Sequence, residues 1–91
     1  MRILEKNITV ANRRGVHSRV ATALAMIAKE QDIVLQIVHG PRWIDCTSIL
    51  DVLSLALVCG STITVRVQGG DAATEQALAA VQRILTAQDE G

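Results

Sequence analysis

The segment 62–68 constrains the fold most, because its residues alternate strictly between apolar and polar types. Such alternation is typical of a β-strand with one buried face and one face toward solvent. The apolar positions are Ile63, Val65 and Val67, and the residues between them are polar. One arrangement that satisfies this pattern is a single antiparallel sheet with helices on one side only, which is a two-layer α+β domain.

The rest of the chain divides into six further predicted elements, delimited by apolar periodicity and by turn residues. The sequence predicts strands at 3–10, 33–38 and 42–45, and helices at 18–30, 48–58 and from Asp71 to about Ala87. Asp71 is expected to be the N-cap of the last helix. The order is strand, helix, strand, strand, helix, strand, helix, with no linker or repeat, so we expect a single domain over residues 1–91.

The size and composition of the chain exclude several classes of protein. Its 91 residues allow one small domain with little room for a deep enclosed active site, so we expect a surface site. Nine Lys and Arg residues balance nine Asp and Glu residues, and Trp43 is the only aromatic residue. A chain without net positive charge and without aromatic stacking platforms is not expected to bind nucleic acid.

The location of the protein is predicted from its N-terminus, its apolar runs and its cysteines. Charged residues within the first six positions come too early for the apolar core of a signal peptide. The longest apolar run, 49–58, is too short to cross a membrane. Cys46 and Cys59 do not form a CxxC pair or match a metal-ligand spacing. We therefore expect a cytoplasmic protein with reduced cysteines, no membrane insertion, no metal ion and no cofactor.

The run Gly15-Val16-His17-Ser18-Arg19 places a histidine where the first predicted helix begins. A helix N-terminus offers unpaired N–H donors and partial positive charge, which favour phosphate. We expect the imidazole there to be neutral and nucleophilic at pH 7, and Arg19 can pair with a phosphoryl group. The run therefore indicates transient phosphorylation of a ring nitrogen of His17. These residues leave open the alternative that His17 is merely a polar residue near a helix cap.

Ser48 and Asp51 match the [ST]-x-x-[DE] pattern of a helix start. We expect Ser48 to cap the second helix. Its hydroxyl is also a candidate phosphorylation site, because added charge at that point would alter any nearby binding surface.

The second predicted helix carries two apolar stripes. The first stripe consists of Ile49, Val52, Leu53 and Ala56, and the second of Leu50, Leu53 and Leu57. A helix on one face of a sheet needs only one stripe, so we expect the other to form an exposed patch that docks partners. A deeply buried middle helix is the alternative.

Together these features resemble the HPr family, the histidine-containing phosphocarriers of the bacterial phosphotransferase system. The resemblance rests on the run around His17, on Ser48-Ile49-Leu50 and on Gly60 before a strand, and it covers roughly residues 2–88. It implies an α+β open-faced β-sandwich, in which a four-stranded antiparallel sheet has three helices on one face.

The resemblance also implies a function. Family members accept a phosphoryl group, derived from phosphoenolpyruvate, from enzyme I. They carry it on Nδ1 of the histidine that matches His17 and pass it to an EIIA-type domain, assisted by the arginine that matches Arg19. Such a protein is a stoichiometric carrier rather than an enzyme, and it serves sugar uptake or regulation linked to the phosphotransferase system.

Further residues take expected roles from the same resemblance. The serine that matches Ser48 is phosphorylated in many members by HPr kinase/phosphorylase. Ile49, Leu50 and Leu53 match positions where the family docks its partners. We expect a monomer, because this patch must be free for successive partners.

The chain departs from the usual family pattern at four positions. Val20 stands where a proline is usual, although its N–H adds a donor for phosphate. Thr47 stands where lysine is common, and Asp51 stands where glycine or lysine is common. Both departures make the charge beside the predicted docking patch less positive. Ala56 replaces a frequent glycine, a change expected to favour the helix.

The sequence leaves two other functions open. One is a regulatory HPr-like binding protein that is switched by phosphorylation of Ser48 without phosphotransfer at His17. The other is a small interaction or ligand-sensing domain without phosphate chemistry, in which replacement of His17 by Gln would have little consequence.

Overall fold

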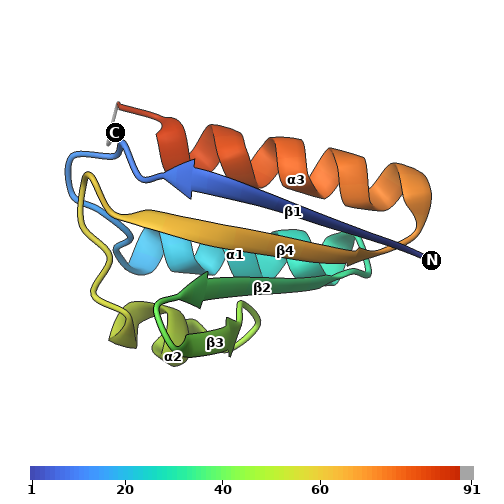
Figure 1. The fold of residues 1–91 in the computed structure, drawn as a ribbon, viewed down its shortest axis with the longest axis horizontal. Helices are drawn as coiled ribbons and strands as arrows, with labels where there is room; N and C mark the ends of the chain where they lie inside the picture. The colour runs from blue at the N-terminus through green and yellow to red at the C-terminus, as the bar shows by residue number, and fades with distance from the viewer. Residues whose placement is uncertain (89–91) are drawn as a thin grey trace.

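Seven elements follow one another along residues 1–88, the part of the chain that the computed structural model describes (Figure 1). They are β1 (Arg2–Thr9), α1 (Ser18–Glu30), β2 (Val34–His39), β3 (Arg42–Asp45), α2 (Ile49–Ser54), β4 (Thr62–Gly69) and α3 (Asp71–Thr86). The predicted order is confirmed, and apart from the end of α2 the boundaries agree with the sequence to within one residue. No helix in this part of the chain is long and apolar enough to span a membrane.

The strands form one antiparallel sheet in the order β1-β4-β2-β3. The alternating strand β4 lies in the interior of the sheet and pairs with both β1 and β2. Its apolar side chains, Ile63, Val65 and Val67, are buried, while the polar residues between them are only partly buried. One face of the sheet is therefore covered and the other is open, as the sequence predicts.

The helices of the described chain cover the apolar face of the sheet and confirm the α+β open-faced sandwich. Figure 1 shows α3 running along β1, and α1 lying behind β4 and β2. The largest fully buried side chains come from both layers and include Leu24 of α1, Leu35 of β2 and Leu85 of α3. On the open face, the guanidinium of Arg66 lies over the Trp43 ring, 5.4 Å from its centroid.

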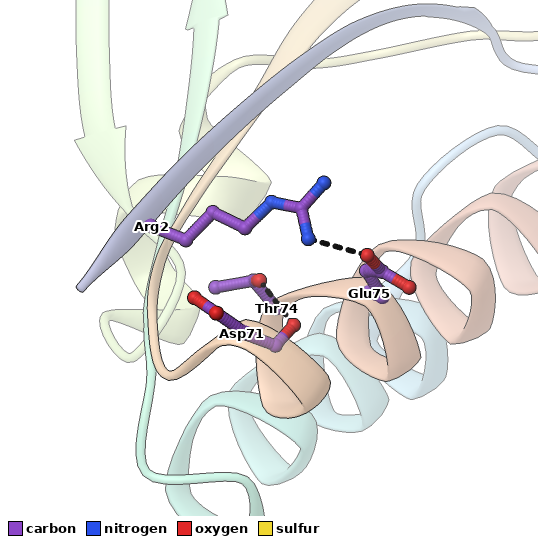
Figure 2. Close-up of polar contacts among 4 residues, drawn as sticks. All are labelled: Arg2, Asp71, Thr74 and Glu75. Atoms are coloured by element: carbon purple, nitrogen blue, oxygen red, sulfur yellow. Dashed lines mark hydrogen bonds and ion pairs between the residues drawn. The ribbon is translucent and has the colours of Figure 1, made fainter.

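The start of α3 corrects one predicted cap. Gly70, not Asp71, is the N-cap: its backbone is extended and its carbonyl accepts the N–H of Thr74 at 2.9 Å. Asp71 lies in the first turn, where its negative carboxylate interacts favourably with the positive end of the helix dipole. Figure 2 shows the Thr74 hydroxyl donating to the Asp71 carbonyl and Arg2 of β1 forming an ion pair with Glu75. The ion pair joins α3 to the edge strand β1.

The second helix ends four residues earlier than the sequence predicts, at Ser54 rather than Val58. Leu55 is the C-cap, and Ala56 follows with φ of +52°, in the left-handed region that ends a helix. Leu57 is buried in the core from a loop rather than from the helix. The expectation that Ala56 favours the helix was therefore wrong, because Ala56 lies past its end in a conformation that glycine adopts more readily.

Candidate functional site

The loop after β1 is held against the segment that precedes β4. The N–H of Val10 donates to the Ser61 carbonyl at 2.8 Å, and the N–H of Gly60 donates to the Val10 carbonyl at 2.7 Å. The next N–H, that of Ala11, donates to the carbonyl of Leu85 at the end of α3. In Figure 1 this loop, the start of α1 and the segment before β4 lie together at one end of the sheet. The loop therefore has a fixed path to the start of α1.

Asn12 shapes the turn within this loop. Its side chain is buried, and its Oδ1 accepts the N–H of Arg14 at 3.1 Å. Its backbone carbonyl accepts the N–H of Gly15 at 2.9 Å. An asparagine side chain that bonds a backbone N–H two residues on is a common means of closing a turn. Asn12 is thus a structural residue of the candidate site.

Gly15 brings the loop into close contact with the segment after α2. Its φ is +69°, and a Cβ on this residue would lie 2.2 Å from the Leu57 carbonyl oxygen. The next N–H, that of Val16, donates to the same oxygen at 3.0 Å. Both the backbone conformation and the close approach therefore require glycine here.

His17 is the N-cap residue of α1, at the helix start where the sequence places it. Its backbone is extended, with φ of −94° and ψ of −178°, and its carbonyl accepts the N–H of Ala21. Its Nδ1 accepts the backbone N–H of Arg19 at 3.3 Å. This contact turns Nδ1 toward the first turn of the helix. The half-buried imidazole thus has one nitrogen directed at the helix N-terminus.

The surroundings of His17 suit an anion. The first N–H groups of a helix have no partners within the helix and carry partial positive charge. The first turn of α1 contains no acidic residue, and Arg19 lies in that turn with an exposed side chain. Val20, which stands where proline is usual in the family pattern described above, is buried in the core. A phosphoryl group on Nδ1 would meet donors and positive charge rather than carboxylates.

Ser48 is the N-cap residue of α2, as predicted, but its hydroxyl makes no capping hydrogen bond. Its N–H donates to the Asp45 carbonyl at 3.0 Å. The preceding residue, Thr47, donates both its N–H and its hydroxyl to one carboxylate oxygen of Asp45. The turn is therefore closed by Asp45 and Thr47, which leaves the Ser48 hydroxyl outside the cap.

The predicted docking residues differ in exposure. Leu50 is 79% exposed, whereas Ile49 and Leu53 are half-buried and pack against the core. Leu57, which belonged to the predicted second stripe, is in the core. The exposed part of the patch is therefore smaller than the stripe and centres on Leu50. Helix α2 contacts α1, the helix that His17 caps.

A family model described as the PTS HPr component phosphorylation site matches residues 4–87. The chain belongs to the HPr family. It is similar to the phosphocarrier protein NPr of Shewanella violacea, with 41% identity over 69 residues that make up 76% of each chain. It is also similar to the phosphocarrier protein HPr of Treponema pallidum, with 33% identity over 87% of this chain and 88% of that one.

The fold comparison agrees with the sequence comparison. The crystal structure of a phosphocarrier protein HPr from Bacillus anthracis superposes with a TM-score of 0.82 and 26% identity. The alignment covers 93% of this chain and 99% of that one. The fold of this chain is therefore the HPr fold over nearly its whole length.

Three residues around the site have roles that the sequence did not predict. Arg42 of β3 donates to Ser54 at the end of α2, Ala56 takes the left-handed conformation, and the Leu57 carbonyl receives the N–H of Val16. One signal was available, because a frequent glycine at position 56 in the HPr family is typical of a residue just past a helix end. No sequence pattern marked the other two.

The two cysteines are both free but differ in environment. Burial, and to a lesser extent the nearby Asp45 carboxylate, raises the pKa of the Cys46 thiol to about 12. The exposed Cys59 lies beside the loop after β1, with its Sγ 3.7 Å from the Ala11 carbonyl oxygen. Within residues 1–88, no three His, Cys, Asp or Glu side chains group in a way that could hold a metal ion.

Proposed function

We propose that this HPr-family protein is a stoichiometric phosphocarrier that accepts a phosphoryl group on Nδ1 of His17. The donor is phosphorylated enzyme I, charged by phosphoenolpyruvate, and the acceptor is an EIIA-type domain of a sugar-uptake or regulatory branch. The observation that carries this proposal is the position of His17 Nδ1, which faces the Arg19 N–H at the start of α1. We also propose that the protein is a monomer and that it is cytoplasmic, and its two free cysteines are in keeping with that compartment.

In the transfer step, the lone pair of Nδ1 attacks the phosphorus carried by the donor. A P–N bond forms to His17 while the bond to the donor breaks, and the leaving group keeps the electron pair. The 3.3 Å contact with the Arg19 N–H is long for a hydrogen bond, so the lone pair is released at little cost. The freed N–H can then donate to a phosphoryl oxygen, and the Arg19 guanidinium can neutralise its charge.

The same geometry favours release of the phosphoryl group. When Nε2 carries a proton, the phosphorylated imidazole is positively charged, and a positively charged ring leaves readily. His17 is half-buried at the surface, not enclosed, so a second partner can reach the phosphorus in line with the P–N bond. We therefore assign this protein the role of a substrate for one partner and a donor to the next, rather than that of an enzyme.

Partners are proposed to dock on the exposed side of α2. Leu50 is the residue that protrudes most, and the half-buried Ile49 and Leu53 flank it on the same short helix. Because α2 contacts α1, a partner seated on Leu50 lies close to the helix that His17 caps. Apolar anchors of this kind supply a large share of the binding energy in protein interfaces.

Phosphorylation of Ser48 is a second candidate function, favoured by one observation. The Ser48 hydroxyl makes no capping bond, so its modification breaks no contact that holds the start of α2. A phosphate there would place negative charge beside Leu50, next to Asp51 in the first turn, and would weaken docking of an acidic partner. The enzyme required would be an HPr kinase/phosphorylase that uses ATP.

Uptake of labelled phosphate from phosphoenolpyruvate through enzyme I tests the carrier function. We expect label that is labile to acid and stable to alkali on the wild type and on His39→Ala, and none on His17→Ala. His39 is the matched control, because it is the other histidine of the chain. Label on His17→Ala, or none on folded wild type, would overturn the carrier proposal. In the second case, incorporation from ATP that is lost in Ser48→Ala would support the regulatory function instead.

A further inference from the structure

The short helix α2 depends on neighbouring elements for its position. It has only six residues, and a helix of that length is not stable on its own in water. Its last turn contains carbonyl groups that have no partner within the helix, and it has no basic residue of its own to satisfy them. The contacts at this end therefore decide where the exposed Leu50 lies.

Arg42 of β3 provides those contacts. Its guanidinium donates to the Ser54 carbonyl at 3.2 Å and to the Ser54 hydroxyl oxygen at 2.8 Å. The Ser54 hydroxyl in turn donates to the Asp51 carbonyl at 2.6 Å. One arginine thus fixes both the backbone and the side chain of the last helical residue, with its positive charge at the negative end of the helix.

The chain continues from this end of α2 to the loop that carries His17. The N–H of Ala56 donates to the Leu53 carbonyl at 3.1 Å, and Ala56 turns the chain with its positive φ. Two residues on from Leu55, the carbonyl of Leu57 receives the Val16 N–H. A displacement of Ser54 would be passed through this tight turn to Val16, which immediately precedes His17.

We propose that Arg42 is a positioning residue for phosphotransfer. It holds the docking helix α2 in a fixed position relative to the loop that presents His17. The proposal rests on the proposed carrier function, because the position of α2 relative to this loop matters only if one partner contacts both Leu50 and the imidazole. Arg42 acts through Ser54 and does not touch the transferred group. The competing explanation is that its charge attracts a partner directly.

Steady-state phosphorylation by enzyme I separates these two explanations. Arg42→Met removes the contacts together with the charge, whereas Ser54→Ala removes only the hydroxyl contacts and leaves the charge in place. We expect each variant to raise the KM for this protein by about three- to tenfold, with kcat within about twofold of the wild type. The double variant is expected to be no worse than Arg42→Met, because both changes break the same contact. Lys29→Met, in the last turn of α1, is the charge-matched control and should leave KM unchanged.

Hydrogen exchange of the Val16 amide gives a readout that does not depend on phosphotransfer. We expect this amide to exchange at least about tenfold faster in Arg42→Met and in Ser54→Ala than in the wild type, under native conditions. The amides of β4 should keep their wild-type rates, which excludes general loss of stability. A normal KM and normal Val16 exchange in Ser54→Ala would overturn the proposal and leave Arg42 as a surface charge. Failure of the wild type to take up phosphate would refute the carrier function instead, and Val16 exchange would still report on the connection.

Discussion

The backbone N–H of Val16 donates to the carbonyl of Leu57 at 3.0 Å, which ties the loop before His17 to the segment after α2. Two parts of the candidate site that lie some forty residues apart in the sequence thus meet through one hydrogen bond. The phosphorylation loop and the docking helix are therefore parts of one structural unit, and substitutions at their junction should affect both.

Gly15 is the most sensitive position at this junction. Gly15→Ala is expected to destabilise the fold by about 2–5 kcal/mol, because its Cβ would collide with the Leu57 carbonyl and φ is positive. Gly40→Ala is the matched control: φ there is +59°, but a Cβ would meet nothing within 4 Å. Its cost should be only about 1 kcal/mol of backbone strain. Urea unfolding of both variants measures the difference, and equal losses would contradict the predicted collision.

Ala56→Gly is expected to stabilise the protein by about 0.5–1 kcal/mol. Relief of the left-handed strain at Ala56 exceeds the extra entropy that glycine gives the unfolded chain. Ala79→Gly, at an exposed position inside α3, should instead destabilise by about 1 kcal/mol. The free energy of unfolding of the two variants, measured side by side, should therefore move in opposite directions. A loss of stability in both would show that Ala56 is not strained.

The two thiols should differ in reactivity and in their effect on alkaline stability. Cys59 should react with a thiol reagent in the native protein, whereas Cys46 should react only after unfolding, because it is buried and its pKa is raised to about 12. Between the ordinary thiol pKa of 9.0 and about 12, the unfolded chain loses the Cys46 proton while the folded chain keeps it. Stability should therefore fall as pH rises through this range, by up to about 1.4 kcal/mol per pH unit from this group. Cys46→Ala should show a shallower decline, and an identical decline would contradict the assignment.

Leu50→Ala separates docking from folding. Because Leu50 is 79% exposed, its truncation should change the free energy of unfolding by less than about 0.5 kcal/mol. Binding to enzyme I should weaken by about tenfold, since the truncation removes the side-chain atoms that would be buried against the partner. Ile3→Ala is the control and should bind normally, because the exposed Ile3 lies on β1, at the edge of the sheet opposite β3, which contacts α2. Titration calorimetry measures both, and normal binding by Leu50→Ala would place the docking surface elsewhere.

The architecture could be predicted from the sequence because burial and alternation coincide in its strands. Ile63, Val65 and Val67 are apolar and buried on one face, so the pattern alone predicts a sheet covered on one side. The end of α2 could not be predicted in the same way. Leu55 and Leu57 are both buried, but a short apolar run does not show whether its segment is a helix or a loop. The contact that decides it, from Val16 to Leu57, comes from a distant part of the chain.

The site was predictable in position but not in its hydrogen bonds. The glycine bend and the helix start place His17 at an N-terminus, and this position is confirmed. Which ring nitrogen faces the helix depends on the side-chain rotamer, which sequence does not specify. The capping pattern likewise placed Ser48 correctly at the N-cap, but the Ser48 hydroxyl makes no capping bond. The turn is closed instead by the Asp45 carboxylate, which accepts both donors of Thr47. The predicted N-cap of α3, Asp71, was wrong by one residue, because Gly70 takes the extended conformation that the N-cap requires.

Transfer of the phosphoryl group to Nδ1 of His17 can be tested directly by one NMR spectrum. The protein is labelled with 15N in its histidine rings, phosphorylated with phosphoenolpyruvate and enzyme I, and examined by 31P–15N correlation at alkaline pH. We expect a single one-bond coupling to the Nδ1 resonance of His17, while both ring nitrogens of His39 remain unmodified. A coupling to Nε2 of His17, or to any nitrogen of His39, would contradict the claim.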